Sequence, residues 1–128
     1  YSGSDEALVS NYLLGGMAAE AGKLTDAEKY LRIAADGGDK NYASLASFAL
    51  AHVEKSLGKT AEAEKLLRGL MEKPTVFVSK EQATIALARV IMNVKPNEAR
   101  KLLEPLRTST RSAVSRSSLT TLAEMPQQ

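Results

Sequence analysis

Apolar residues recur every three or four positions through most of the chain, which is the spacing of one face of an α-helix. The sequence holds nineteen alanines, seventeen leucines and few runs of β-branched residues, a composition that favours helices with closely approaching axes. We therefore predict an all-α fold. The pattern places helices at residues 5–21, 24–36, 41–57, 60–72, 79–92, 96–106 and 112–125.

A segment of thirteen residues occurs twice. Residues 22–34 match residues 58–70 at seven of thirteen positions, with a shift of 36 residues. A third copy follows at the same shift, and three alanines mark equivalent positions in the copies: Ala27, Ala63 and Ala99. The helical patterns before the copies also superimpose, with shifts of 36 and then 37 residues. The chain is thus predicted to contain three helix–turn–helix units.

Short turns join the two helices of each unit. Gly22 and Gly58 occupy the same place in the first two turns, whereas the third turn is one residue shorter and has no glycine there. We expect Asn93 to take the left-handed conformation in its place, because asparagine tolerates it. Ser79, with Gln82 three residues later, resembles a capping box and predicts a helix start.

The whole chain, residues 1–128, is predicted to be one domain. Its units span residues 5–40, 41–77 and 78–110, followed by a capping helix at residues 112–125. The cap is expected to cover the apolar face of the third unit, because an open repeat array exposes hydrophobic surface. An imperfect cap would leave a second interaction site or a dimer interface.

The first unit, residues 8–41, resembles a tetratricopeptide repeat. The residues that carry the resemblance are a Leu-Gly pair, a turn glycine, a small alanine, a large apolar residue and a second alanine: Leu14, Gly15, Gly22, Ala27, Leu31 and Ala34. Asn11 and Asp39 stand where that motif has an aromatic residue and a proline, and the period exceeds the usual ~34 residues. The resemblance implies a right-handed stack of about three helical hairpins, which binds other proteins.

Three further runs are similar to bacterial membrane-anchored tetratricopeptide-like proteins of the kind that includes the ancillary subunit of the Sec translocon. They lie at residues 42–46, 63–67 and 80–83. This resemblance implies a transmembrane anchor, a periplasmic location, and translocon components or envelope chaperones as partners. The chain begins at Tyr1 rather than Met, so we expect an N-terminal portion to be missing. A soluble cytoplasmic adaptor is the alternative, and an upstream apolar segment of about twenty residues would distinguish the two.

In a stack of such hairpins the first helices line a concave groove. The resemblance to the repeat family implies that twelve residues face this groove: Val9, Tyr12, Gly16, Glu20, Leu45, Phe48, His52, Lys55, Gln82, Ile85, Arg89 and Asn93. Tyr12, Phe48 and Ile85 would form an apolar row beside the cations. An extended peptide with an apolar side chain and a carboxylate would find complementary partners there. Ordinary packing between neighbouring helices is the alternative explanation of the apolar row.

The residues needed for catalysis or cofactor binding are scarce. The chain has one histidine, His52, and no cysteine, which excludes disulfides, thiolate metal sites and zinc sites made of several histidines. It has no Gly-x-Ser-x-Gly motif, and the glycines at residues 37–38 lack the spacing of a phosphate-binding loop. We predict a non-catalytic scaffold without a cofactor, with a self-assembling dimerisation module as an alternative.

The formal net charge of +2 is too near balance to require nucleic acid or an anionic membrane as the partner. One segment is locally basic and carries six cations against Glu98 and Glu104: Lys95, Arg100, Lys101, Arg107, Arg111 and Arg116. It lacks interleaved aromatic residues, so we interpret it as a solvated face, with binding to an anionic surface as the alternative. The longest uncharged stretch, residues 7–19, is too short and too polar to cross a bilayer.

Overall fold

The computed structural model describes residues 5–108 and 112–126. In this part the chain forms seven α-helices, one 3₁₀ helix and no strand, which confirms the all-α prediction. The helices are α1 (Asp5–Glu20), α2 (Leu24–Ala35), α3 (Lys40–Ser56), α4 (Thr60–Glu72), α5 (Lys80–Ile91), α6 (Pro96–Leu103), the 3₁₀ helix η1 (Glu104–Thr108) and α7 (Ser112–Glu124). Each predicted helix agrees with the observed one to within one residue at each end, with one exception. The helix predicted at residues 96–106 ends as α6 at Leu103, and the 3₁₀ helix η1 follows it. None of the helices in the described ranges is long and apolar enough to cross a membrane.

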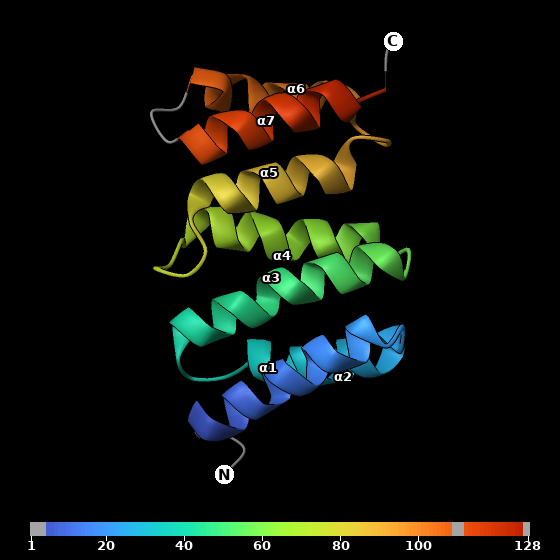
Figure 1. Cartoon of the computed structure of the whole chain (residues 1–128), viewed down its shortest axis with the longest axis vertical. Coiled ribbons are helices and arrows are strands. Elements are labelled where there is room, and N and C mark those ends of the chain that lie inside the picture. The colour runs from blue at the N-terminus through green and yellow to red at the C-terminus, as the bar shows by residue number, and fades with distance from the viewer. Residues whose placement is uncertain (1–4, 109–111, 127–128) are drawn as a thin grey trace.

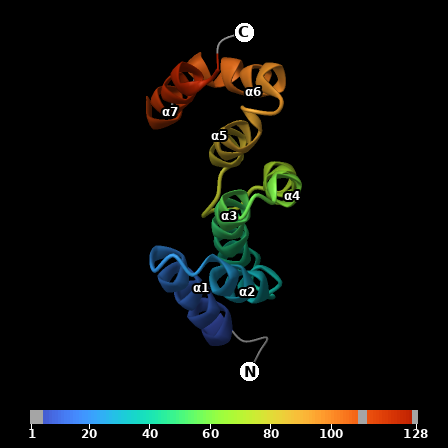
Figure 2. The same ribbon diagram turned by 90° about the vertical axis from the view of Figure 1, so that its right-hand side faces the viewer.

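The helices stack as hairpins along the long axis of the molecule, with α1 and α2 at one end and α6 and α7 at the other (Figure 1). Each of the helices α2 and α4 packs against its own hairpin partner and against the first helix of the next unit. Figure 2 shows α2, α4 and α6 toward the right side of the stack, and α1 and α7 toward the left. This arrangement is the predicted helical-hairpin stack.

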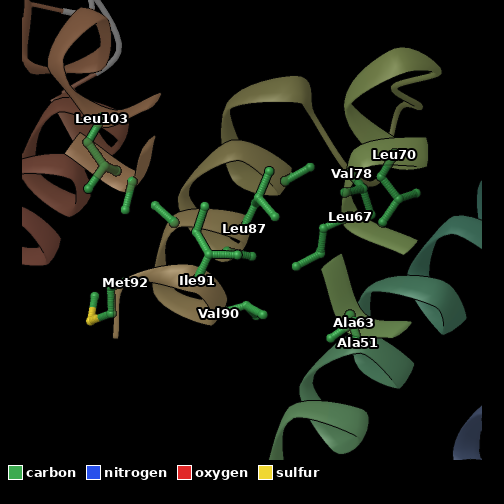
Figure 3. Packing of buried hydrophobic residues seen from close by; sticks show 14 of the residues in the cluster. Ala51, Ala63, Leu67, Leu70, Val78, Leu87, Val90, Ile91, Met92 and Leu103 are labelled. Atoms are coloured by element: carbon green, nitrogen blue, oxygen red, sulfur yellow. The ribbon is translucent and has the colours of Figure 1, made fainter. Parts of the chain in front are cut away.

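Small residues are buried where neighbouring helices pack together. Ala27, Ala63 and Ala99 are fully buried at equivalent places in the three units. Larger residues fill the space between crossings, and the largest cluster, which includes Leu67, Leu87 and Leu103, runs from α3 to the end of α7 (Figure 3). Small side chains let helix axes approach, so the alanines set the spacing that the leucines then fill.

The turn inside each of the first two hairpins needs a left-handed residue. Gly22 and Gly58 have φ angles of 79° and 81°, and the amides that follow them bond back to the carbonyls of Ala18 and Glu54. The prediction for Asn93 is wrong, because no residue other than glycine has a positive φ in the described ranges. The third turn is one residue shorter and closes through bonds from residues 94 and 95 to the Ile91 carbonyl, so it needs no left-handed position.

Two helix starts are fixed by side chains. Ser79 and Gln82 form the predicted capping box, in which each side chain accepts a hydrogen bond from the other residue's amide. Asp39 caps α3 by accepting from the amides of Asn41 and Tyr42. The cap at Asp39 was not predicted from the sequence. These caps orient α3 and α5, the two helices that carry the candidate site.

The last helix covers the end of the stack, as predicted. α7 contacts α5, α6 and η1, and the main cluster includes buried Met125 and partly buried Leu122. Arg111, one of the cations of the basic segment, lies outside the described residues. Through this placement α7 also forms one wall of the groove described next.

Candidate functional site

Five of the predicted groove residues meet around one cavity: Phe48, His52, Gln82, Ile85 and Arg89. Phe48 and His52 lie one turn apart on α3, and Ile85 and Arg89 lie one turn apart on α5, so each pair shares a helix face. These five side chains line a cavity of about 180 Å³, which Ala86 and Ser117 complete. The structure therefore brings the second and third units together at this site, which we call the α3–α5–α7 groove.

The apolar part of the groove is held in place by local contacts. The rings of Phe48 and His52 lie 4.8 Å apart between centroids with an interplanar angle of 55°. His52 Nδ1 is 2.8 Å from the Phe48 carbonyl oxygen, which fixes the orientation of the imidazole. Phe48 and Ile85 are partly buried against the main cluster and also line the cavity. Phe48 and Ile85 can therefore both pack between helices and form the floor of the groove.

The polar part of the groove already holds a carboxylate. Arg89 Nη1 donates to Glu124 Oε2 at 3.0 Å, and Lys55 Nζ donates to the Arg89 carbonyl oxygen at 3.3 Å. Both side chains of the Arg89–Glu124 pair are more than a third exposed, so the pair contributes at most about 1 kcal/mol. A carboxylate from a ligand would therefore replace Glu124 at little cost.

A second cavity adjoins the first. It has a volume of about 230 Å³ and is lined by Arg89, Arg116, Ser117 and Thr120. Arg89 of α5 and Ser117 of α7 border both cavities, so α7 forms one wall of the groove. The sequence prediction did not include α7 in the groove. One feature of the sequence could have indicated that α7 contributes to the groove. Glu124 follows Arg89 by 35 residues, which is close to one repeat period.

The predicted groove residues of the first unit do not join this site. Tyr12 is partly buried against the small clusters that hold Leu8 and Leu31. Gly16 and Glu20 are exposed on α1, and Asn93 is exposed beyond the end of α5. The candidate site is thus confined to the second and third units and α7.

Comparison with protein families gives a match to a model described as tetratrico peptide repeat, over residues 12–99 and 44–125. The chain belongs to the tetratricopeptide repeat family. Comparisons with curated proteins and with solved structures give no match. Tetratricopeptide repeats are generally protein-interaction domains rather than enzymes. Among the described residues, no group of three or more acidic or histidine side chains is placed to hold a metal ion.

A larger cleft of this tetratricopeptide stack lies between α2, α3 and α4. It has a volume of about 440 Å³, and its lining includes Arg32, Glu54 and Glu62. Glu54 is 1% exposed; its Oε1 lies 3.5 Å from Arg32 Nη2, and its Oε2 has no hydrogen-bond partner among the described residues. Burial raises the pKa of the Glu54 carboxyl, and the charge of Arg32 opposes this shift. Sequence reasoning missed this residue because Ala18 and Ile91 stand at the equivalent positions of the other two units.

Several cations of the basic segment are engaged within the chain. Lys95 pairs with Glu64 at 3.2 Å, and Arg107 pairs with Glu104 at 3.0 Å. Arg100 donates to the Pro126 carbonyl at 2.8 Å. Arg116 faces the second groove cavity instead. These four cations therefore have three roles: ion pairs with glutamates, a hydrogen bond to a backbone carbonyl, and lining of the second groove cavity.

Proposed function

We propose that this tetratricopeptide protein is a non-catalytic scaffold that binds an extended peptide in the α3–α5–α7 groove. The observation that carries the proposal is the convergence of Phe48, His52, Ile85 and Arg89, from two different repeats, on one cavity. Apolar side chains form its floor and cations form its rim. This combination fits a peptide with one large apolar side chain and a nearby carboxylate.

Binding would use a surface that is already formed. The apolar side chain enters the cavity between Phe48 and Ile85, and the carboxylate takes the place of Glu124 on the Arg89 guanidinium. Helices α3 and α5 hold these residues in position, so the protein loses little conformational freedom on binding. Lys55, whose ammonium group lies 3.3 Å from the Arg89 carbonyl oxygen, adds a positive charge beside Arg89 that would attract an acidic segment.

We further propose a location on the periplasmic side of the bacterial inner membrane, with translocon components or envelope chaperones as partners. The resemblance of the runs at residues 42–46, 63–67 and 80–83 to membrane-anchored envelope proteins supports this location. Fractionation of cells that express the full-length gene product, followed by protease treatment of spheroplasts, tests it. A product that stays in the cytosolic fraction would identify a cytoplasmic adaptor instead.

Affinity capture from a bacterial envelope extract tests the groove. The wild-type protein is compared with a Phe48→Ala, Arg89→Ala double variant, and with a Lys29→Ala, Ile33→Ala double variant as the matched control. Lys29 and Ile33 are exposed on α2 and border neither groove cavity. Circular dichroism and thermal unfolding establish that each variant is folded.

We expect the groove variant to lose proteins that the wild type and the control retain. Because Phe48 is partly buried, a single Arg89→Glu variant serves as a second test with less risk to the fold. Equal retention by the wild type and both folded groove variants would remove the groove from the proposed function.

A further inference from the structure

The two junctions between units differ in one ion pair. At the second junction, Arg68 of α4 forms an ion pair with Glu98 of α6. Arg32 and Glu62 stand at the equivalent positions of the first junction, 36 residues earlier in the chain. Arg32 instead lies 3.5 Å from Glu54 of α3, and Glu62 forms no ion pair with any cation in the described ranges. The first junction therefore has a carboxylate without the cation that pairs with it in the second.

Glu54 accounts for the different position of Arg32. Glu54 is 1% exposed, and the equivalent positions of the other units hold the apolar residues Ala18 and Ile91. A buried carboxylate attracts a guanidinium more strongly than an exposed one, because the low dielectric around it screens less. Arg32 therefore pairs with Glu54 rather than with Glu62.

The carboxyl groups of Glu54 and Glu62 are close enough to interact. Burial raises the pKa of Glu54, the charge of Arg32 opposes this shift, and the carboxyls of Glu62 and Glu28 add to it. Glu54 Oε2 has no hydrogen-bond donor among the described residues. Glu28 has a cation of its own, since Lys59 Nζ lies 2.8 Å from it. Glu54 and Glu62 thus share a single guanidinium, and one buried acceptor has no donor.

These carboxyl groups line the cleft of about 440 Å³ between α2, α3 and α4. This volume far exceeds that of a metal ion, and the wall includes apolar Leu66 and Leu70 beside the small residues Ser47 and Gly69. Apolar walls suit the carbon stem of a long chain that ends in a charge. Lys65, the other cation of the lining, is exposed and forms an ion pair with neither carboxylate. The cleft therefore fits an organic cation on a flexible stem.

We propose that the α2–α3–α4 cleft binds an alkylguanidinium group between Glu54 and Glu62. The template is Arg68 at the second junction, whose guanidinium pairs with Glu98 and donates from Nε to Glu64 Oε2 at 2.9 Å. The ligand guanidinium donates to Glu54 Oε2 and to the Glu62 carboxylate, while its carbon stem lies along the apolar wall. A planar guanidinium offers several donors to two carboxylates at once, whereas an ammonium acts as a point charge.

The ligand reaches Glu54 past side chains that can move. The side chain of Arg32 is 53% exposed and Glu62 is also exposed, so both can turn aside. An alkylguanidinium occurs as the arginine side chain of a partner polypeptide and as a free small molecule, and both sources present the same group. The cleft shares no lining residue with the α3–α5–α7 groove, so this inference is independent of the proposed function.

Titration of the isotope-labelled protein, followed by NMR, tests the cleft. The ligands are an end-blocked Gly-Arg-Gly tripeptide, the same tripeptide with citrulline or lysine in place of arginine, and butylguanidinium as the free molecule. Citrulline has the shape of arginine without its charge. The protein variants are Glu54→Gln and Glu62→Gln, with Glu72→Gln as the matched control, since Glu72 is an exposed glutamate of α4 outside the cleft lining. Circular dichroism establishes that each variant is folded.

We expect the arginine tripeptide to shift the amide signal of Gly69, and citrulline to weaken the affinity by at least about tenfold. Glu54→Gln should also weaken it by at least about tenfold, because it removes a buried charge from the contact. Glu62→Gln should weaken it about two- to fivefold, the range for an exposed ion pair, and Glu72→Gln should bind as the wild type does. Tighter binding of the tripeptide than of butylguanidinium would assign the ligand to a polypeptide, and the reverse order to a free molecule.

Several results would overturn the proposal. They are no binding of either guanidinium ligand, equal binding of the arginine and citrulline tripeptides, and binding that both Glu54→Gln and Glu62→Gln leave unchanged. Equal binding of the arginine and lysine tripeptides would overturn the assignment to a guanidinium. Signal shifts confined to the residues around Arg89 would place the ligand in the α3–α5–α7 groove, and the cleft would then have no part in its binding.

Discussion

The ammonium group of Lys59 lies 2.8 Å from a carboxylate oxygen of Glu28, across the junction between the first and second units. One period later Lys95 and Glu64 repeat the contact at 3.2 Å. The repeat therefore carries a charged contact between neighbouring units as well as an apolar one. Glu64 also accepts a hydrogen bond from Arg68 of its own helix, so this carboxylate joins two cations.

The removal of the Glu64 charge should weaken the second junction. We expect Glu64→Gln to lower the free energy of unfolding at pH 7 by about 1 kcal/mol, a small value because both cations are largely exposed. The loss should shrink in high salt, which screens exposed charges. Urea unfolding at low and high salt measures it, with Glu72→Gln as the control on the same helix. Equal effects of the two substitutions would contradict the role of Glu64.

The pH dependence of Glu64 follows from its partners. Hydrogen bonds from Arg68 and Lys95 hold the pKa of this carboxyl below its ordinary value of 4.5. The folded state therefore releases this proton more readily than the unfolded state, and the stabilisation is present above pH 4.5 and lost as the pH falls through the folded pKa. The stability difference between wild type and Glu64→Gln should shrink from pH 6 to pH 3. A constant difference would contradict this assignment.

Glu54 should show the opposite pH dependence. Burial raises its pKa above 4.5, against the charge of Arg32 and with support from Glu28 and Glu62. Its contribution to stability is then complete below pH 4.5 and is lost as the pH rises through the folded pKa. We expect Glu54→Gln to gain stability relative to the wild type between pH 4.5 and pH 7. Chemical unfolding across this range measures the difference, and a relative loss with rising pH would contradict the prediction.

Two adjacent glycines in α1 differ in what surrounds them. A Cβ atom at Gly15 would lie 2.5 Å from Leu31 Cγ, and Leu31 is buried, whereas nothing lies within 4 Å of a Cβ at Gly16. We expect Gly15→Ala to destabilise the protein by about 1–3 kcal/mol through overpacking. Gly16→Ala should stabilise it by about 0.5–1 kcal/mol, because alanine loses less entropy in a helix. Thermal unfolding of the two variants provides the comparison, and destabilisation of similar size by both would contradict it.

The features that the sequence predicted are those that repeat. The helices, the turn glycines Gly22 and Gly58, and the placement of Phe48 beside Ile85 all follow from a period of 36 or 37 residues. A repeated pattern determines local geometry and the register between neighbours, so it predicts both. The use of this surface in peptide binding stays a prediction.

The features that the sequence did not predict are those that break the period. Deletion of one residue removed the left-handed position expected at Asn93. Glu54 stands in the second unit where the first and third units have apolar residues, and its burial depends on the packing of α2, α3 and α4. The pairing of Glu124 with Arg89 depends on the position of α7, which a single sequence pattern does not determine.

Glu124 provides the last prediction, because it occupies the position proposed for the ligand carboxylate. Glu124→Gln removes the charge that competes for Arg89 and keeps the shape of the side chain. We expect this variant to bind an acidic peptide with an apolar residue about two- to fivefold more tightly than the wild type, since an exposed ion pair of up to about 1 kcal/mol no longer has to be replaced. Its stability should change by less than about 1 kcal/mol.

Isothermal titration of the same peptide into the wild type, Glu124→Gln and Glu104→Gln measures this effect. Glu104 forms a comparable exposed pair with Arg107 on η1 and borders neither groove cavity, so its substitution controls for the loss of one negative charge. A gain that appears only in Glu124→Gln, and that disappears when Arg89→Ala is added, would locate the ligand carboxylate at Arg89. Equal gains in both glutamate variants would instead reflect the net charge of the protein, and the carboxylate would then have to bind elsewhere.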